Sequence, residues 1–535
     1  LRRKSTVDGL TDDWLAPMII SQWLDHAPSE NSTSTLAYDG YGNITRVTGP
    51  SNHKSDQLTI DYTYETAQNQ YITTVSNSYG DQTCMDYNYA TGTPKYTIDP
   101  NGYVLYFEYD NADRPKRVFG PREYADGSTP YTLEFDYYPQ GFDPTSGVFG
   151  EGVPVAITRH YVGESAKAAP QTGCTAAAPG TRPSAAGTDI IRTATFIDGL
   201  GRVAQVKKDA SWYNPNTQQN ERRQEVSGMT TYDWQGMTTQ ETLSWLENST
   251  NLQGFSTFNT SPSNGTKTAA IYEYDLLNRV KRVFLATANK QAVASNNPTS
   301  ANYHIATAYS FSSAYDGTMR FMQNVEDNQH DQKTQTQKFF NSKSAVVATK
   351  TLNGLIVLDE ITTQFEYDLL GQMTKTTNPL GLETTYAYDW FGRAYTENHP
   401  DRGVTSSNFD KAGNVIQITT ANATVNMTYD YNRLKTKSYP STPSINNVTY
   451  TYGAAGDGKN GAGRVTSVLQ GNNVVQEFYK YDELGQVSSE NKTIAIPLVG
   501  EMKFVTTYNY DSWGRIKNMA YPDGENVRYT YAQAG

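Results

Sequence analysis

The chain has 535 residues, and its 55 Asp and Glu against 44 Lys and Arg give a formal net charge of −11. This acidic balance argues against nucleic-acid binding, which needs clustered Lys and Arg to meet the phosphate backbone. No apolar run approaches the roughly 20 residues of a membrane-spanning helix, so we expect no membrane span.

Residues 1–33 lack the repeated pattern that fills the rest of the chain. Residues 11–14 and the apolar run that follows them predict a short helix with Asp near its N-terminus. We interpret this segment as a junction to something upstream. The chain begins at Leu1 without Met or a signal peptide and stops just after a Thr- and Tyr-rich strand pattern, so both ends look like cuts through a longer protein.

From residue 34 onward a short phrase returns: an aromatic residue, any residue, Tyr or Phe, Asp, two residues, Gly or Asn, and often Arg. In residues 34–361 the copies are worn, with insertions rich in small and polar residues at 163–190 and 248–267. Residues 362–535 hold the regular copies, and motif aromatics at 367, 388 and 409 set a period of about 21 residues. The residues that we assign to the structural motif are Tyr38, Asp39, Tyr109, Asp110, Tyr274, Asp275, Tyr367, Asp368, Gly371, Tyr388, Asp389, Gly392, Arg393, Tyr481, Asp482, Gly485, Tyr510, Asp511, Gly514 and Arg515.

Each repeat predicts two strands and two turns. Before the Asp lies an alternating run such as 382–388, rich in Thr and Tyr, which predicts a β-strand. Asp at the first position and Gly at the fourth indicate a type I turn, in which the Asp side chain bonds to nearby backbone and the Gly takes a positive φ. A second strand follows, and then a reverse turn such as Pro400–Gly403.

The fold class is therefore all-β, a long antiparallel sheet of hairpins, with helix confined mainly to the first thirty residues. Tyr (40) outnumbers Phe (18) and Trp (7) together, which suits a sheet with two partly wet faces. Tyrosines two positions apart point to the same face and predict aromatic ladders over successive hairpins. Arg393 and Arg515 could pair with the Asp of a neighbouring hairpin, but exposed pairs contribute only about 0–1 kcal/mol.

The repeated phrase resembles the YD repeat of the RHS family, found in bacterial RHS proteins, in the B and C components of toxin complexes and in animal teneurins. The match covers the chain from about Ser34 to its end. The resemblance implies a sheet strip that spirals into a hollow shell, called a cocoon, which in toxin members encloses a C-terminal cytotoxic segment. Some toxin shells cut that segment with acidic residues near a motif that ends the repeats. Residues 99–102 are only slightly similar to that motif and are better explained as an inter-repeat turn, so no catalytic residue is carried over.

The sequence offers no pattern for catalysis. Its six His residues lack metal-site spacing, and no nucleophile elbow or nucleotide-binding motif is present. The glycine-rich stretch 453–459 joins two predicted strands and lacks the helix that a phosphate loop must open. The motif supplies one Asp per repeat, which favours turn holding over calcium binding. We expect no enzyme activity, no cofactor and no metal.

Cys84 and Cys174 are the only cysteines. They cannot build a disulfide framework or a metal cluster. One bridge between them is possible if the chain is exported, and two free thiols are the alternative.

The leading functional hypothesis is a structural shell segment of a secreted bacterial protein that encloses and helps to deliver a C-terminal toxin payload. Its partners would be the payload segment, of the same or a partner chain, and secretion or toxin-complex components. Its location would be secreted or at the cell surface. The alternatives are a cell-surface adhesion module of the teneurin type and, less favoured, a carbohydrate-binding or carbohydrate-processing protein.

Overall fold

The structure is a computed structural model. It describes residues 3–8, 19–24, 27–140, 142–143, 148–149, 153–163, 165–183, 190–248, 268–285, 305–313, 317–327, 334–353, 360–441, 444–471 and 474–531. Within these ranges the chain is almost entirely β, as the Thr- and Tyr-rich alternation predicts. Thirty-eight strands belong to one sheet, and β12 and β13 form a separate pair.

The strands follow one another along the strip, and consecutive neighbours pair in antiparallel fashion. The first arc comprises β1 (Arg3–Asp8), β2 (Ile19–Leu24), β3 (Ala27–Tyr38), β4 (Ile44–Ser51), β5 (Gln57–Tyr64), β6 (Ile72–Asn77), β7 (Gln82–Asn88), β8 (Thr93–Ile98), β9 (Val104–Tyr109), β10 (Pro115–Phe119), β11 (Leu133–Tyr138), β12 (Phe142–Asp143), β13 (Val148–Phe149) and β14 (Val155–Tyr161).

The middle arc comprises β15 (Ile190–Ile197), β16 (Val203–Asn214), β17 (Gln219–Tyr232), β18 (Thr238–Thr242), β19 (Trp245–Asn248), β20 (Thr268–Tyr274), β21 (Val280–Leu285), β22 (Ile305–Ser313), β23 (Met319–Asp327), β24 (Thr334–Phe340), β25 (Val346–Asn353), β26 (Glu360–Tyr367), β27 (Met373–Thr377) and β28 (Glu383–Tyr388). The long β17 pairs with both β18 and β19. The strip then continues from β18 to β20.

The last arc comprises β29 (Ala394–His399), β30 (Gly403–Phe409), β31 (Val415–Thr419), β32 (Thr424–Asp430), β33 (Arg433–Ser438), β34 (Val448–Tyr452), β35 (Val465–Gln470), β36 (Val475–Tyr481), β37 (Val487–Ile496), β38 (Gly500–Tyr510), β39 (Ile516–Ala520) and β40 (Asn526–Arg528). A one-residue register shift recurs at the motif aromatic, for example where Tyr367 pairs with Met373 and Tyr388 with Ala394. Such bulges bend a strand pair and increase its twist, so a regular bulge supplies regular curvature.

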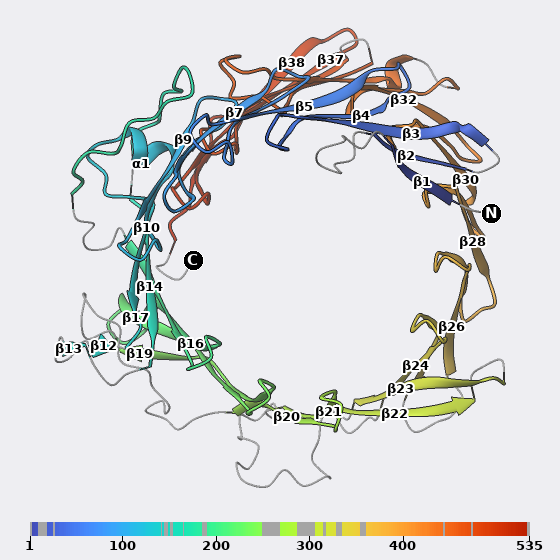
Figure 1. The fold of residues 1–535 in the computed structure, drawn as a ribbon, viewed down its shortest axis with the longest axis horizontal. Coiled ribbons are helices and arrows are strands. Elements are labelled where there is room, and N and C mark those ends of the chain that lie inside the picture. Colours follow the sequence, from blue (N-terminus) through green and yellow to red (C-terminus); the bar gives the residue numbers. More distant parts are fainter. Residues whose placement is uncertain are drawn as a thin grey trace.

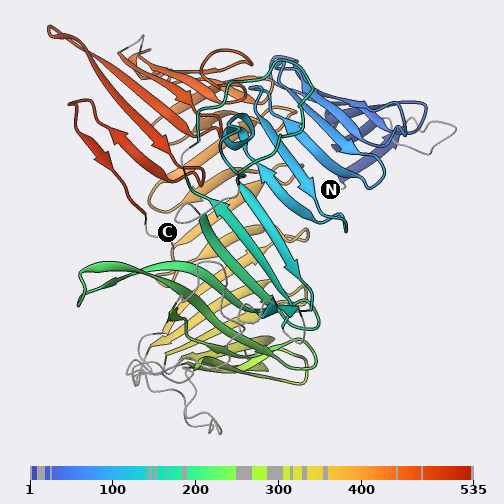
Figure 2. The ribbon, with the colours of Figure 1, turned by 90° about the vertical axis from the view of Figure 1, so that its left-hand side faces the viewer.

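The strip bends through a full circle and overlaps its own beginning. Figure 1 shows β1–β5 and β30–β38 overlying one another, while β20–β23 form a single layer on the opposite side of the ring. Figure 2, seen from the side, shows that the early and late arcs are displaced along the ring axis. Among the described residues, β1 pairs with β2 and β40 with β39, so the strip is an open spiral and not a closed barrel.

Helix occurs where the sequence pattern did not place it. Residues 11–18 of the expected N-terminal helix lie outside the described residues, and Ile19 and Ile20 belong to β2. The expectation that helix concentrates in the first thirty residues is wrong for the part described. A single turn of helix, α1 (Pro121–Ala125), follows β10 with Pro at its start, where the missing N–H costs nothing. A short 3₁₀ turn occupies Ser444–Asn446.

The apolar core is divided into small clusters along the strip. One comprises Val155, Ile157, Ala194 and Phe196, a second Cys84, Tyr96, Ile98 and Val104, and a third Phe339, Val347 and Ala348. A repeat array buries its apolar faces between neighbouring units and does not need one central core. The buried side chains outside these clusters include many polar ones, and several of these lie where the two ends of the spiral meet.

Candidate functional site at the seam between two turns

The motif Asp holds the turn that follows it. Gly371 N donates to Asp368 O at 3.2 Å, and Asp368 Oδ1 accepts from Leu370 N at 2.9 Å and Gln372 N at 2.8 Å. Gly371 has a φ of 86°, as the Asp-x-x-Gly spacing predicts. The φ values of Gly392, Gly485 and Gly514 are 83°, 82° and 78°. The unit is a type I turn followed by a left-handed residue, which closes a hairpin.

The motif Arg pairs with the Asp of its own turn. Arg393 Nε lies 2.5 Å from Asp389 Oδ2. The same pair occurs at Asp110–Arg114, Asp198–Arg202, Asp275–Arg279 and Asp511–Arg515. The expectation that Arg393 and Arg515 pair with the Asp of a neighbouring hairpin is wrong, because the tight turn brings the fifth residue back over the first. Arg393 reaches the next repeat differently, by donating to Asp410 O at 3.1 Å and lying 4.4 Å from the ring centroid of Phe409.

In many repeats the motif Tyr uses its hydroxyl to tie the repeat to the one before it. Tyr388 OH donates to Met373 O at 2.8 Å. The same bond joins Tyr64 to Ile44, Tyr137 to Pro115, Tyr232 to Val203, Tyr274 to Thr238, Tyr367 to Val346, Tyr429 to Val415, Tyr481 to Val465, Tyr510 to Val487 and Tyr531 to Ile516. Sequence reasoning explained these tyrosines only as ring ladders. The preference for Tyr over Phe at this position was the signal for the hydroxyl bond.

The two ends of the spiral dock edge to edge, and we call this contact the seam. Motif turns of the last arc meet inter-repeat turns of the first arc. Five of the hydrogen bonds across it run from Ser32 Oγ to Lys411 O at 3.0 Å, from Asn52 Nδ2 to Tyr431 O at 3.1 Å, from His53 N to Asp410 Oδ2 at 3.1 Å, from Ala462 N to Asn101 Oδ1 at 3.0 Å and from Ser512 Oγ to Tyr161 O at 2.5 Å. Several of these partners are buried, namely Asn52, Asn101 and Asp410. The seam is therefore a packed interface and not a chance approach of two loops.

Arg433 of the last arc anchors the seam near its middle. Its guanidinium lies 2.6 Å from Asp81 Oδ2 and 3.4 Å from the ring centroid of Tyr79. Tyr79 in turn donates its hydroxyl to Asp430 O at 2.9 Å. Asp81 is buried, so its negative charge depends on Arg433 for compensation.

Arg122 of α1 anchors the other part of the seam. Its Nη2 lies 3.1 Å from Asp482 Oδ2 and 3.2 Å from Glu483 Oε2, and its Nη1 donates to Tyr510 O at 2.9 Å. Asp482 and Glu483 are both buried. Burial raises the pKa of Asp482 above its usual range, while bonds from backbone N–H groups and the charge of Arg122 oppose that rise.

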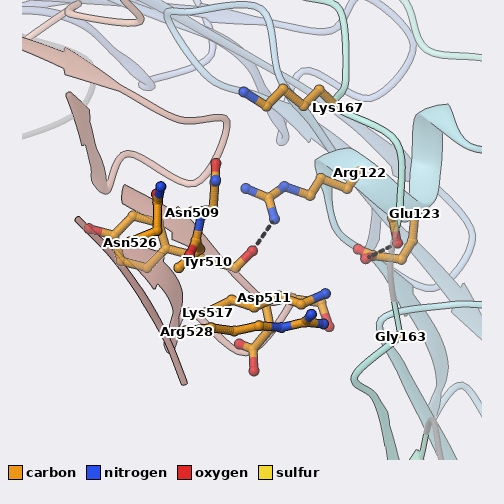
Figure 3. A pocket seen from close by; sticks show the side chains of 13 residues that line it. Arg122, Glu123, Gly163, Lys167, Asn509, Tyr510, Asp511, Lys517, Asn526 and Arg528 are labelled. Carbon is orange, nitrogen blue, oxygen red and sulfur yellow. Dashed lines mark hydrogen bonds between the residues drawn. The ribbon is translucent and has the colours of Figure 1, made fainter. Parts of the chain in front are cut away.

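A cavity of about 610 Å³ adjoins this anchor, between the α1 side of the seam and β38–β40. Figure 3 shows Arg122 reaching from the α1 side toward Tyr510, with Lys167 above it and Lys517 and Arg528 below. Glu123 and Asp511 supply the two carboxylates of the lining. The lining has four cationic side chains, Arg122, Lys167, Lys517 and Arg528, of which Arg122 is already paired with Asp482 and Glu483.

The structure brings only part of the predicted motif set to the seam. Asp482, Tyr510 and Asp511 lie there, and the other motif residues hold turns elsewhere on the strip. Sequence reasoning missed Arg122, Asp81 and Glu483, since their partners lie hundreds of residues away. The available signal was a polar residue, such as Glu483, directly after a motif Asp whose turn does not need it. The turn at residues 99–102 is an inter-repeat turn, as expected.

Within the described ranges, no group of three or more His, Cys, Asp and Glu side chains is arranged to hold a metal ion. In the same part of the chain, no helix is long and apolar enough to span a membrane. Cys84 and Cys174, left open by the sequence, are joined in a disulfide. Most of the insertion at 248–267 lies outside the described residues.

No protein-family model and no curated protein matches the chain. Solved structures with a similar fold come from toxin complexes. A crystal structure of TcdB2-TccC3-TEV matches with a TM-score of 0.70 and 13% identity over 100% of this chain and 29% of that one. The Tc holotoxin pore of Photorhabdus luminescens gives the same four values. A crystal structure of TcdB2-TccC3 matches with a TM-score of 0.69 and 14% identity, over 100% of this chain and 27% of that one. The chain thus spans less than a third of these proteins, and it shares with them an all-β, cocoon-like fold.

Proposed function

We propose that this chain is a stretch of shell wall from a secreted bacterial protein of the RHS type, and that the wall encloses a toxin payload segment of the same or a partner chain. The observation that carries the proposal is the seam. Two turns of one strip are joined edge to edge by the buried polar groups Asp81, Asp410, Asp482 and Glu483 with their partners. A wall that must exclude protease and solvent needs such sealed edges, whereas a rigid spacer does not.

The repeat and the fold likeness support the same proposal. The motif Asp, Gly, Tyr and Arg take part in turn geometry and in bonds between repeats, which supports a structural role for them. The similar solved structures are of toxin complexes. The segment itself is proposed to have no enzyme activity and to act at the cell surface or after secretion.

Protease protection tests this function. The chain is expressed joined to its native downstream region, and the same region is expressed alone. We expect the joined region to resist protease and the isolated region to be digested. A joined protein carrying Arg122→Ala and Arg433→Ala should lose protection, whereas one carrying Arg402→Ala should keep it, because Arg402 pairs with Glu397 at the surface, away from the seam contacts. Equal digestion of the joined and isolated regions would contradict containment.

A contact module of the teneurin type is the second candidate, and one observation favours it. The tips of the motif turns in the middle arc expose apolar side chains at Leu276, Leu277, Leu369 and Leu370. Apolar patches left at a surface commonly mark interaction sites. If the chain is such a module, replacing these leucines by Ser should abolish binding of the isolated chain to cells while leaving protease protection of a joined region unchanged.

A further inference from the structure

We propose that residues 165–183, which we call the strap, form a latch over the seam that the Cys84–Cys174 disulfide holds shut and a dithiol reductant releases. The proposal rests on the shell function above and adds a way of regulating its seam. The strap is the longest described stretch of the 163–190 insertion and has no helix or strand of its own. In Figure 1 the chain that leaves β14 loops past α1 on the outer side of the ring.

The middle of the strap lies directly on the first arc. Gln171 N donates to Gly102 O at 2.8 Å, and Tyr96 OH donates to Cys174 O at 3.1 Å. The approach at Gly102 is so close that a Cβ there would stand 2.5 Å from Gln171 O. Gly102 also has a φ of 88°, so two independent constraints require glycine at this point.

The far end of the strap is bonded to the helix that carries the seam anchor. Arg182 donates to Asp126 O at 2.5 Å and Tyr124 O at 2.9 Å. Tyr124 OH donates to Ala177 O at 2.9 Å. The strap therefore packs against α1 and the residue that ends it, next to Arg122.

The near end of the strap reaches across to the last arc. Ala168 N donates to Glu483 Oε1 at 3.2 Å. The other oxygen of the same carboxylate, Oε2, lies 3.2 Å from Arg122 Nη2. Glu483 is therefore held between the strap and α1, and the strap is part of the seam. Moving the strap would remove one of the partners of a carboxylate that is only 6% exposed.

Apart from the backbone at its two ends, the disulfide is the one covalent tie of the strap to the sheet. Its other attachments are hydrogen bonds, the contact of Ala176 with the cluster of Cys84, Tyr96 and Val104, and the Arg182 guanidinium 5.5 Å from the ring centroid of Phe119. Each such hydrogen bond contributes modestly on its own, because water replaces it when the strap lifts. The bridge keeps these weak bonds together, so breaking it should release them together.

The chemistry is thiol–disulfide exchange. A thiolate of the dithiol attacks the sulfur of Cys174, which is exposed, while Cys84 is only 5% exposed. The S–S bond of the protein breaks, Cys84 leaves as a thiolate and takes a proton, and a mixed disulfide remains on Cys174. The second thiol of the reductant then displaces Cys174 as a thiol and forms a cyclic disulfide. Two electrons and two protons pass from the dithiol to the protein.

Hydrogen exchange on the full chain tests the latch, with dithiothreitol as the dithiol and mass spectrometry reporting the state of the cysteines. Reduction should raise exchange severalfold in the strap and at residues 482–486, and leave residues 430–433 on the distant part of the seam unchanged. Cys174→Ser should show the released pattern without reductant and should not respond to it.

Two results of the exchange experiment would overturn the latch. One is a pair of free thiols in protein kept under oxidising conditions. The other is unchanged exchange at residues 482–486 after complete reduction. The latch and the shell function fail separately, because protection of a joined region in the oxidised protein tests containment alone. Protection that is equal before and after reduction leaves containment standing and contradicts the latch.

Discussion

Arg433 and Asp81 form an ion pair of 2.6 Å across the seam, although one belongs to the last arc of the spiral and the other to the first. The pair is largely buried, and the Arg433 guanidinium also covers the ring of Tyr79. Contacts of this kind hold the last arc of the spiral against the first arc. The seam is therefore where the stability of the wall can be tested one residue at a time.

Removing Arg433 should loosen the seam. Arg433→Ala leaves the buried carboxylate of Asp81 without its partner, and we expect a local loss of about 2–5 kcal/mol. Hydrogen exchange at residues 77–81 should rise accordingly. Arg402→Ala is the matched control, because its exposed pair with Glu397 contributes only about 0–1 kcal/mol. Equal effects of the two changes would show that the Arg433 pair does not hold the seam.

The hydroxyl of the motif tyrosine should stabilise the fold by about as much as one hydrogen bond. Tyr388→Phe removes the bond to Met373 O, and we expect a loss of about 0.5–1.5 kcal/mol in the free energy of unfolding. Tyr386→Phe, two residues earlier on the same strand, is the control, because the Tyr386 hydroxyl is not one of the repeat-to-repeat bonds. A denaturation midpoint that shifts no further for Tyr388→Phe than for Tyr386→Phe would count against the hydroxyl ladder.

A side chain at the motif glycine should destabilise the protein because the backbone there has a positive φ. Gly371 has open space where a Cβ would lie, but its φ is 86°. Gly371→Val should therefore cost at least about 1–2 kcal/mol through strain alone. Gly392→Val should cost at least as much, since a Cβ there also meets Gln372 Nε2 at 2.8 Å. Gly40→Ala has open space and no positive φ, and it is the control for both in a thermal melt. A neutral Gly371→Val would refute the turn assignment.

The seam should weaken in acid near His160. The His160 ring lies 4.7 Å from that of Trp513, between centroids, and burial lowers the pKa of His160 below its usual value. A histidine whose pKa is lowered by folding binds a proton more readily when unfolded, so its contribution is present above about pH 6.5 and is lost as the pH falls further. His160→Phe should keep the ring contact and remove this loss.

The check is the free energy of unfolding measured from pH 8 down to pH 5 for both proteins. The two curves should separate only below about pH 6.5, where the His160 protein should lose stability faster. Parallel curves over the whole range would show that His160 titrates as it does in the unfolded chain.

The sequence predicts what is local and misses what depends on the spiral. The turn from Asp368 to Gln372 is fixed by residues four apart, so spacing alone predicts the positive φ of Gly371. The Arg393–Asp389 pair is equally local, because Arg393 is the fifth residue counted from Asp389, and the spacing within the turn is enough to predict it. The Arg433–Asp81 and Arg122–Glu483 pairs depend on how bulge and twist add up over a full circle of hairpins. No pattern within one repeat encodes that sum, so the seam, α1 and the strap could not be predicted from it.

Cryo-electron microscopy of the chain joined to its native downstream region, under oxidising conditions, tests containment most directly. We expect a sealed seam at Arg122 and Arg433, with density for the downstream region inside the ring that Figure 1 shows. Density for that region outside the ring, or two turns separated along the seam, would contradict containment.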